Sequence, residues 1–132
     1  MSPVTEVSGP TELTSDTFLA LVRQPGIAVI DFWASWCGPC KSFAPVFAAA
    51  AARHPQVLWG KVDTEAESAL AADLNVRSIP TTMVFRDGVL LFDQPGALPG
   101  PALDEIVQRV MALDMDEIRS EIASQASQPE AR

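Results

Sequence analysis

The sequence predicts an α/β fold in which a central mixed β-sheet is flanked by helices on both faces. Three observations carry this prediction. Strand-like and helix-like stretches alternate along the chain, the run 27–33 is apolar enough for a buried strand, and a hairpin signal follows in the second half. The length of 132 residues and the hydrophobic content of 48% suit one compact domain with a buried core.

The first predicted elements are a helix and a strand. Thr14 or Ser15 can cap a helix that ends near Arg23, because a hydroxyl oxygen accepts a hydrogen bond from a free backbone N–H of the first turn. Residues 27–33 form a continuous β-branched and aromatic run, which is typical of a central strand buried on both faces. Asp31 is the single charge in this run and is unusual for that reason.

A second helix is expected over residues 37–53, where apolar side chains recur at helical spacing. Pro45 lies inside this helix and predicts a kink, since proline removes a backbone donor. His54-Pro55 ends the helix, because the residue before a proline disfavours helical geometry. A second strand is expected over residues 57–62.

The remaining elements are a helix, a β-hairpin, a loop rich in proline and glycine, and a last helix. Asn75 tolerates the left-handed conformation and is expected to end the helix. Asp87-Gly88 between two apolar runs is a strong hairpin signal, and Pro101 suits the first turn of a helix. The expected ranges are 65–74 for the helix, 82–85 and 89–92 for the hairpin strands, 93–100 for the loop and 101–113 for the last helix.

Composition divides the chain into three parts. Residues 1–9 are polar and predict a flexible N-terminal arm, whereas residues 10–113 hold the alternating elements of the domain. In residues 114–132, Ile118 and Ile122 are one helical turn apart and the sequence then becomes polar. This pattern predicts a frayed helical extension followed by a polar tail.

The charge balance narrows the classes of partner. Nine basic residues stand against seventeen acidic ones, for a net charge of −8. This argues against nucleic acid and against an anionic membrane surface, because both need clustered Lys and Arg. The N-terminus lacks the features of a signal peptide, and no stretch approaches the roughly 20 apolar residues of a membrane helix. The cytoplasm is therefore the expected compartment.

The only two cysteines, Cys37 and Cys40, lie where a strand leads into a helix. Free N–H groups and the helix dipole favour a thiolate on Cys37 at that position. Residues three apart share a helix face, so the two sulfurs can close a disulfide. Gly38 and Pro39 place no bulk over Cys37, and Trp36 offers a flat apolar wall for an extended substrate. The pattern favours a catalytic redox pair, with Cys37 as nucleophile and Cys40 as resolving thiol.

Other interpretations of the cysteines remain open. A zinc site needs four ligands, and the chain adds only His54, which lies beyond a helix of about four turns. An inert buried pair would leave the Trp-Cys-Gly-Pro-Cys sequence at a helix start unexplained. A binding module with incidental cysteines predicts that the protein still functions after both cysteines are replaced. We expect no metal.

The segment 29–41, Val-Ile-Asp-Phe-Trp-Ala-Ser-Trp-Cys-Gly-Pro-Cys-Lys, closely resembles the active-site segment of bacterial-type members of the thioredoxin family. The resemblance covers about residues 10–113 and implies the thioredoxin fold. It also implies a dithiol reductant of protein disulfides that is recharged by an NADPH-dependent flavoprotein, thioredoxin reductase, and needs no bound cofactor. The clients would be disulfide-containing proteins, peroxiredoxin-like or ribonucleotide-reductase-like. The protein would be either a general reductase or a dedicated electron donor to one such enzyme. Family members are commonly monomers.

The resemblance also implies roles for two charged residues. Asp31 looks like the buried carboxylate beneath the active site of the family, which exchanges a proton with Cys40 through water. Burial would raise the pKa of such a carboxyl group. Lys61 looks like the lysine that pairs with this acid. The alternatives are a purely structural acid and a solvated lysine at a strand end.

The remaining implied roles concern a substrate groove. Ile79-Pro80 resembles the cis-proline site of the family, which lies against the cysteines and exposes the Ile79 backbone for pairing with substrate. Gly96 looks like the glycine that lets substrate approach the third wall of the groove. The alternative for Ile79-Pro80 is an ordinary trans turn, and the alternative for Gly96 is a plain Pro-Gly turn. Pro95 departs from the aliphatic residue usual before this glycine, which predicts a stiffer groove.

Overall fold

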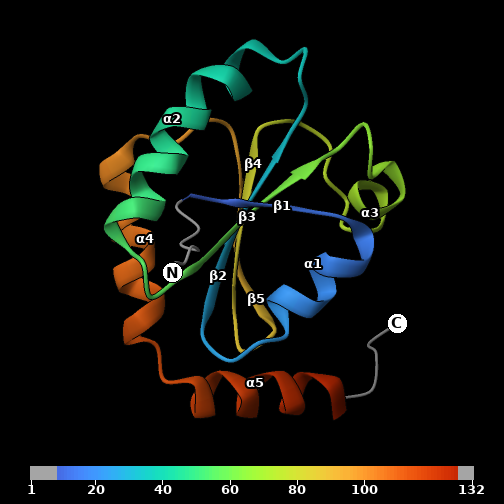
Figure 1. Cartoon of the computed structure of the whole chain (residues 1–132). Helices are drawn as coiled ribbons and strands as arrows, with labels where there is room; N and C mark the ends of the chain where they lie inside the picture. The colour runs from blue at the N-terminus through green and yellow to red at the C-terminus, as the bar shows by residue number, and fades with distance from the viewer. Residues whose placement is uncertain (1–8, 128–132) are drawn as a thin grey trace, which may run out of the picture.

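The computed structural model describes residues 9–127, so the expectations for residues 1–8 and 128–132 lie outside the described residues. A five-stranded sheet forms the centre, with helices on both of its faces, as the sequence predicts (Figure 1). The elements in chain order are β1 (Thr11–Leu13), α1 (Ser15–Val22), β2 (Ile27–Trp33), α2 (Gly38–Arg53), β3 (Leu58–Asp63), α3 (Ser68–Asp73), β4 (Thr81–Arg86), β5 (Val89–Pro95), α4 (Gly100–Ala112) and α5 (Met115–Ser127).

The strands lie in the order β1-β3-β2-β4-β5. Strand β3 runs parallel to both β1 and β2, whereas β4 is antiparallel to β2 and β5 is antiparallel to β4. The sheet is therefore mixed, and β2 is its central strand. Because β2 runs directly toward the start of α2, the cysteine segment lies at one end of the sheet (Figure 1).

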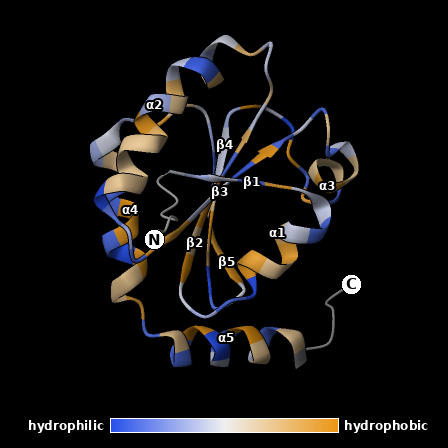
Figure 2. Cartoon of the chain, viewed as in Figure 1, coloured by the Kyte–Doolittle hydropathy of each residue, from blue (hydrophilic) through white to orange (hydrophobic). Residues whose placement is uncertain are grey.

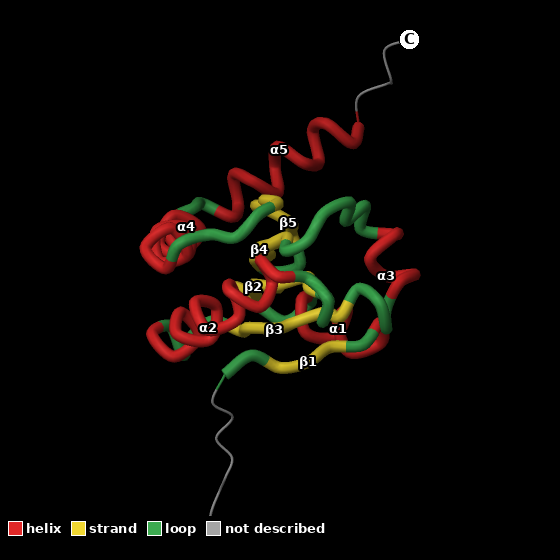
Figure 3. Tube along the Cα trace, turned by 90° about the horizontal axis from the view of Figure 1, so that it is seen from above, coloured by secondary structure: helices red, strands yellow, loops and turns green. Residues whose placement is uncertain are grey.

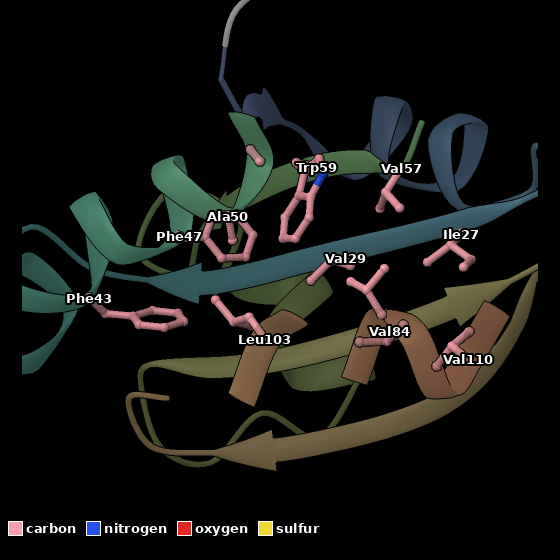
Figure 4. Packing of buried hydrophobic residues seen from close by; sticks show 12 residues of the cluster. Ile27, Val29, Phe43, Phe47, Ala50, Val57, Trp59, Val84, Leu103 and Val110 are labelled. Carbon is pink, nitrogen blue, oxygen red and sulfur yellow. The ribbon is translucent and has the colours of Figure 1, made fainter. Parts of the chain in front are cut away.

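Helices α2 and α4 cover one face of the sheet, and α1 and α3 cover the other (Figure 3). On the first face, Phe47 and Leu103 pack with Val29 and Val84 of the central strands (Figure 4). On the second face, Phe18 packs with Ile30 and other strand residues. Burying one such side chain contributes about 1.5–3 kcal/mol, so packing on both faces of the sheet stabilises β2.

Several expectations about local structure are confirmed. Thr14 caps α1, and its side chain accepts a hydrogen bond from the backbone N–H of Thr17 at 3.3 Å. Asn75 has a φ of 60°, in the left-handed region, directly after the third helix. Asp87 and Gly88 have φ values of 53° and 82°, as a tight hairpin with a right-handed strand twist requires.

Other boundaries differ from the prediction. Strand β1 was not predicted, because three residues of mixed polarity form a strand only by pairing with β3. Helix α3 begins at Ser68 rather than residue 65, since the Asp63 carboxylate accepts hydrogen bonds from the N–H groups of Glu65 and Ala66 and forms a turn. Strand β5 continues to Pro95, which an edge strand tolerates, so the expected loop 93–100 is wrong for its first three residues.

Helix α5 lies across the end of the sheet opposite to the start of α2, and hydrophobic and hydrophilic residues alternate along it (Figures 1 and 2). Met115 is buried, and Arg119 forms an ion pair with Asp87 of the hairpin turn at 3.6 Å. The guanidinium group of Arg86 donates hydrogen bonds to three carbonyl groups at the end of α4. No described helix is long and apolar enough to cross a membrane.

Candidate active site

The transition from β2 to α2 positions the two cysteines. Cys37 is the N-cap residue of α2, with extended backbone geometry, and Cys40 lies in the first turn. The backbone N–H of Cys40 donates a hydrogen bond to Cys37 Sγ at 3.2 Å. Pro39 lies in the first turn, where a missing N–H costs no helical hydrogen bond. The helix terminus therefore directs a donor and a positive partial charge at the Cys37 sulfur.

Cys37 and Cys40 form a disulfide, and their Cα atoms are 5.2 Å apart. Both residues are almost completely buried, with 4% and 3% of their surfaces exposed. Ala34 lies beside them and is fully buried, and Ile79 and Trp33 pack against the group. A substrate sulfur can therefore reach the pair only along a restricted direction.

The residues around the disulfide form an open surface. Trp36 is 66% exposed, and Gly38 and Pro39 are also exposed. The indole N–H of Trp36 donates a hydrogen bond to a carboxylate oxygen of Glu65 at 3.2 Å, which orients the exposed ring. Glu65 was not predicted from the sequence, because nothing local links it to a tryptophan 29 positions earlier.

The loop before β4 forms a second wall of this surface. The Ile79-Pro80 peptide bond is cis, and the Ile79 carbonyl oxygen lies 3.8 Å from Cys37 Sγ. Ile79 is half-buried and Pro80 is buried. The hydroxyl of Thr81 donates a hydrogen bond to the carbonyl of Ser78 at 2.6 Å within this loop. A shallow cavity between this loop and Trp36 is lined by Trp36, Thr64, Val76, Arg77, Ser78 and Ile79.

Gly96 brings the end of β5 to the same loop. Its backbone N–H donates a hydrogen bond to the Pro80 carbonyl at 2.7 Å. Its φ of 98° lies in the region that favours glycine, and no other atom lies within 4 Å of the place where a Cβ would stand. Three segments far apart in the sequence, around residues 37, 79 and 96, are thus brought together in one place.

Asp31 lies in β2 and is completely buried. Val29, two residues earlier, faces α2 and α4, so the alternation of a strand directs Asp31 to the same face. The pKa of Asp31 is raised to about 7: burial is the main cause, the negative charge of Glu12 adds to it, and the positive charge of Lys61 opposes it. Neither carboxylate oxygen has a hydrogen-bond partner among the described residues.

Lys61 lies directly opposite Asp31 in the pairing of β2 with β3. It forms no ion pair with Asp31 among the described residues; its Nζ lies 5.0 Å from the centre of the Trp33 ring instead. Glu12 of β1 is opposite Lys61 on its other side. Glu12 was missed by sequence reasoning because β1 itself was not predicted, and no local signal places it near Asp31.

His54 is the third potential metal ligand in the sequence, after the two cysteines. It lies at the opposite end of α2 from them. Its ring Nε2 is 2.7 Å from a carboxylate oxygen of Asp104, and its ring stacks on Trp59. Arg53 forms an ion pair with the same carboxylate at 3.0 Å. Within residues 9–127, no group of three or more His, Cys, Asp or Glu side chains is arranged to hold a metal ion.

Comparisons with known proteins agree with this geometry. The family model described as Thioredoxin matches residues 9–111. The chain is 46% identical over 122 residues to "Putative thioredoxin 2" of Streptomyces coelicolor, which covers 92% of this chain and 91% of that protein. A mutant thioredoxin from Halobacterium salinarum has a TM-score of 0.76 at 26% identity, covering 85% of this chain and 99% of that one.

A further solved structure concerns the thiol resolving mechanism of a yeast mitochondrial 1-Cys peroxiredoxin via glutathione and thioredoxin systems. A chain of that structure matches with a TM-score of 0.70 and 32% identity. The match covers 76% of this chain and 94% of that chain.

Proposed function

Because this chain belongs to the thioredoxin family and is a thiol–disulfide oxidoreductase that reduces protein disulfides, we propose that it carries electrons from an NADPH-dependent flavoprotein reductase to client proteins. The Cys37–Cys40 disulfide is the electron carrier, and no bound cofactor is required. One observation carries the proposal: Cys37 caps α2, with a backbone N–H directed at its sulfur and the Ile79 carbonyl beside it.

In the first step the Cys37 thiolate attacks one sulfur of a client disulfide. A bond forms between Cys37 Sγ and that sulfur, the client disulfide breaks, and the departing sulfur leaves as a thiolate that takes a proton from solvent. The helix dipole and the N–H of Cys40 stabilise the attacking thiolate, which increases its fraction at neutral pH. The product is a mixed disulfide between protein and client.

In the second step Cys40 releases the client. Its thiol transfers a proton to the Asp31 carboxylate through water, and the resulting thiolate attacks Cys37 Sγ. The Cys37–Cys40 bond forms, the mixed disulfide breaks, and the second client sulfur leaves with its electron pair and is protonated. Two electrons have then moved from the dithiol to the client. The flavoprotein reductase returns two electrons from NADPH.

The raised pKa of Asp31 supports this role, because a group that titrates near neutral pH can both accept and return a proton. The Lys61 charge tunes that pKa from the neighbouring strand. In the groove, Trp36, Gly38 and Pro39 offer an exposed wall. Pairing of substrate backbone with Ile79, beside the buried Pro80, and close approach at Gly96 complete the binding surface that we propose.

Client classes and setting are part of the same proposal. Clients are disulfide-containing proteins of the peroxiredoxin and ribonucleotide reductase kinds, and the similarity to a chain studied with a peroxiredoxin supports the first kind. The protein works as a monomer in a reducing compartment such as the cytoplasm, where a pair of cysteines in an otherwise cysteine-free chain suits catalysis. We also propose the division into an arm (1–9), a thioredoxin domain (10–113) and an extension (114–132); the family match to 9–111 supports it.

Replacement of Cys40 by Ser tests the two-step mechanism. The C40S variant, reduced and mixed with insulin as a disulfide substrate, should accumulate a covalent adduct through Cys37 that mass spectrometry detects. The matched variant C37S should form none. An adduct with C37S alone would reverse the two roles, and no adduct with either would contradict the mechanism. A binding module predicts that the double variant C37S/C40S keeps its cellular function; the redox mechanism predicts its loss.

A further inference from the structure

A row of polar side chains crosses the sheet at the level of Asp31. In the strand pairing, Glu12 is opposite Lys61, Lys61 is opposite Asp31, and Asp31 is opposite Thr82 of β4. Directly paired residues point to the same face of a sheet, so these four side chains share the face covered by α2 and α4. Asp31 has two direct neighbours in this row, Lys61 and Thr82. Thr82 is uncharged and is the more deeply buried of the two.

Thr82 is completely buried, and its hydroxyl has no hydrogen-bond partner among the described residues. Two other threonine hydroxyls near the site are bonded: Thr81 donates to Ser78 O at 2.6 Å and Thr64 donates to Trp33 O at 3.1 Å. Buried polar groups in folded proteins are almost always paired. Asp31 and Thr82 are direct neighbours with complementary needs, since a carboxylate accepts hydrogen bonds and a hydroxyl can donate one.

We propose that Thr82 is a positioning residue for thiol–disulfide exchange: its hydroxyl forms a hydrogen bond with the Asp31 carboxyl group, through one buried water or after rotation about a side-chain bond, and holds that group for proton exchange with Cys40. The inference rests on the proposed role of Asp31. A threonine suits both protonation states, because its hydroxyl donates to the carboxylate and accepts from the protonated acid. A valine of the same shape can do neither.

Other groups also act on Asp31 and must be separated from Thr82. Lys61 of β3 and Glu12 of β1 are the charged residues whose fields reach it. Helix α2, which covers this face, carries the cysteines, and these do not titrate while they form the disulfide. Measurement on the oxidised protein therefore isolates Asp31 from thiol ionisation, and substitution of Thr82 changes no charge.

The test is a pH titration of the Asp31 side-chain carboxyl carbon by ¹³C NMR in oxidised wild type and T82V. A hydrogen bond to a charged acceptor is stronger than one to a neutral partner, so its loss should raise the midpoint by about 0.5 to 1 pH unit. T82S should restore the wild-type midpoint. T81V removes a hydroxyl that is already bonded to Ser78 and should leave the midpoint unchanged.

The kinetic counterpart is the rate of insulin reduction by the reduced protein as a function of pH. At pH 7 about half of the Asp31 groups are ionised in the wild type, and a rise of the midpoint by about 0.5 to 1 unit lowers that fraction about two- to fivefold, so T82V should be about two- to fivefold slower there. T82V added to D31N should have no further effect on the rate. If T82V does not fold, T82A against T82S makes the same comparison.

The outcomes separate the two ideas. An unchanged midpoint in T82V, or a shifted midpoint in T82S equal to that in T82V, overturns the role of Thr82. If D31N alters the rate profile while T82V leaves it unaltered, the function proposed for Asp31 stands and the inference about Thr82 fails. If D31N has no effect on the rate, the proposed role of Asp31 fails, and with it the positioning role of Thr82.

Discussion

Replacement of Asp31 by Asn should stabilise the protein at neutral and alkaline pH. The pKa of Asp31 is raised from 3.8 to about 7 in the folded state, mainly by burial. An acid with a raised pKa binds its proton more tightly when folded, so stability is lost as pH rises from the unfolded pKa to the folded one. The D31N variant escapes this loss, because its neutral amide leaves no charge to bury at this position.

The magnitude follows from the two pKa values. A difference of about 3 units at 1.36 kcal/mol per unit corresponds to about 4 kcal/mol above pH 7.5. Near pH 3 the group is protonated in both states and the difference between variant and wild type should be close to zero. Between these limits the advantage of D31N should grow steadily with pH and reach about 2 kcal/mol near pH 5.5.

The assay is urea unfolding of the oxidised proteins at a series of pH values, with the free energy of unfolding taken from each curve. D73N makes the same chemical change on an exposed residue and should differ from wild type by less than about 0.5 kcal/mol at every pH. A stability difference for D31N that does not vary with pH would refute the reasoning. It would mean that the folded protein stabilises the Asp31 carboxylate to the same extent as water does.

Two further predictions address the surroundings of the site. Replacement of Glu12 by Gln should lower the midpoint of the Asp31 titration by a few tenths of a pH unit, because the Glu12 charge raises the pKa of Asp31. Carbon NMR measures it, and E117Q on α5, with the same change in net charge, is the control; an unmoved midpoint in E12Q would show that the Glu12 charge does not reach Asp31. Replacement of Phe47 by Ala should cost about 3–5 kcal/mol of unfolding free energy, since the ring is completely buried and its centre lies 5.2 Å from that of Trp59. Urea unfolding measures it against F47L, which should cost about 1.5 kcal/mol or less, and a loss below about 1 kcal/mol in F47A would mean that this face repacks around the gap.

The local elements of this fold are largely readable from the amino-acid sequence. The apolar run 27–33 predicts the central strand, because a strand tolerates hydrophobic side chains on both of its faces only when both are covered. Asp87-Gly88 predicts the hairpin through the φ values that such a turn needs. The two cysteines at a helix start predict the redox pair, since their spacing and the helix dipole act within a single turn.

The surroundings of the redox pair depend on contacts between distant segments. Strand β1 exists only through its pairing with β3, and that pairing places Glu12 beside Lys61. Lys61 stands opposite Asp31, yet its ammonium group rests over Trp33 rather than on the carboxylate. Neither arrangement has a local signal, because propensity and periodicity report on neighbours along the chain and not across a sheet.

The sequence by itself determined the fold class, the redox pair and the order of the main elements, because these follow from hydrophobic periodicity, turn chemistry and the field at a helix terminus. The tertiary structure alone decided that the Ile79 carbonyl lies beside Cys37 and that the Gly96 N–H bonds to Pro80. It also decided that Asp31 stands opposite Thr82, with no hydrogen-bond partner for either side chain among the described residues. Strand register and helix packing set these distances, and both arise from burial shared by segments many residues apart.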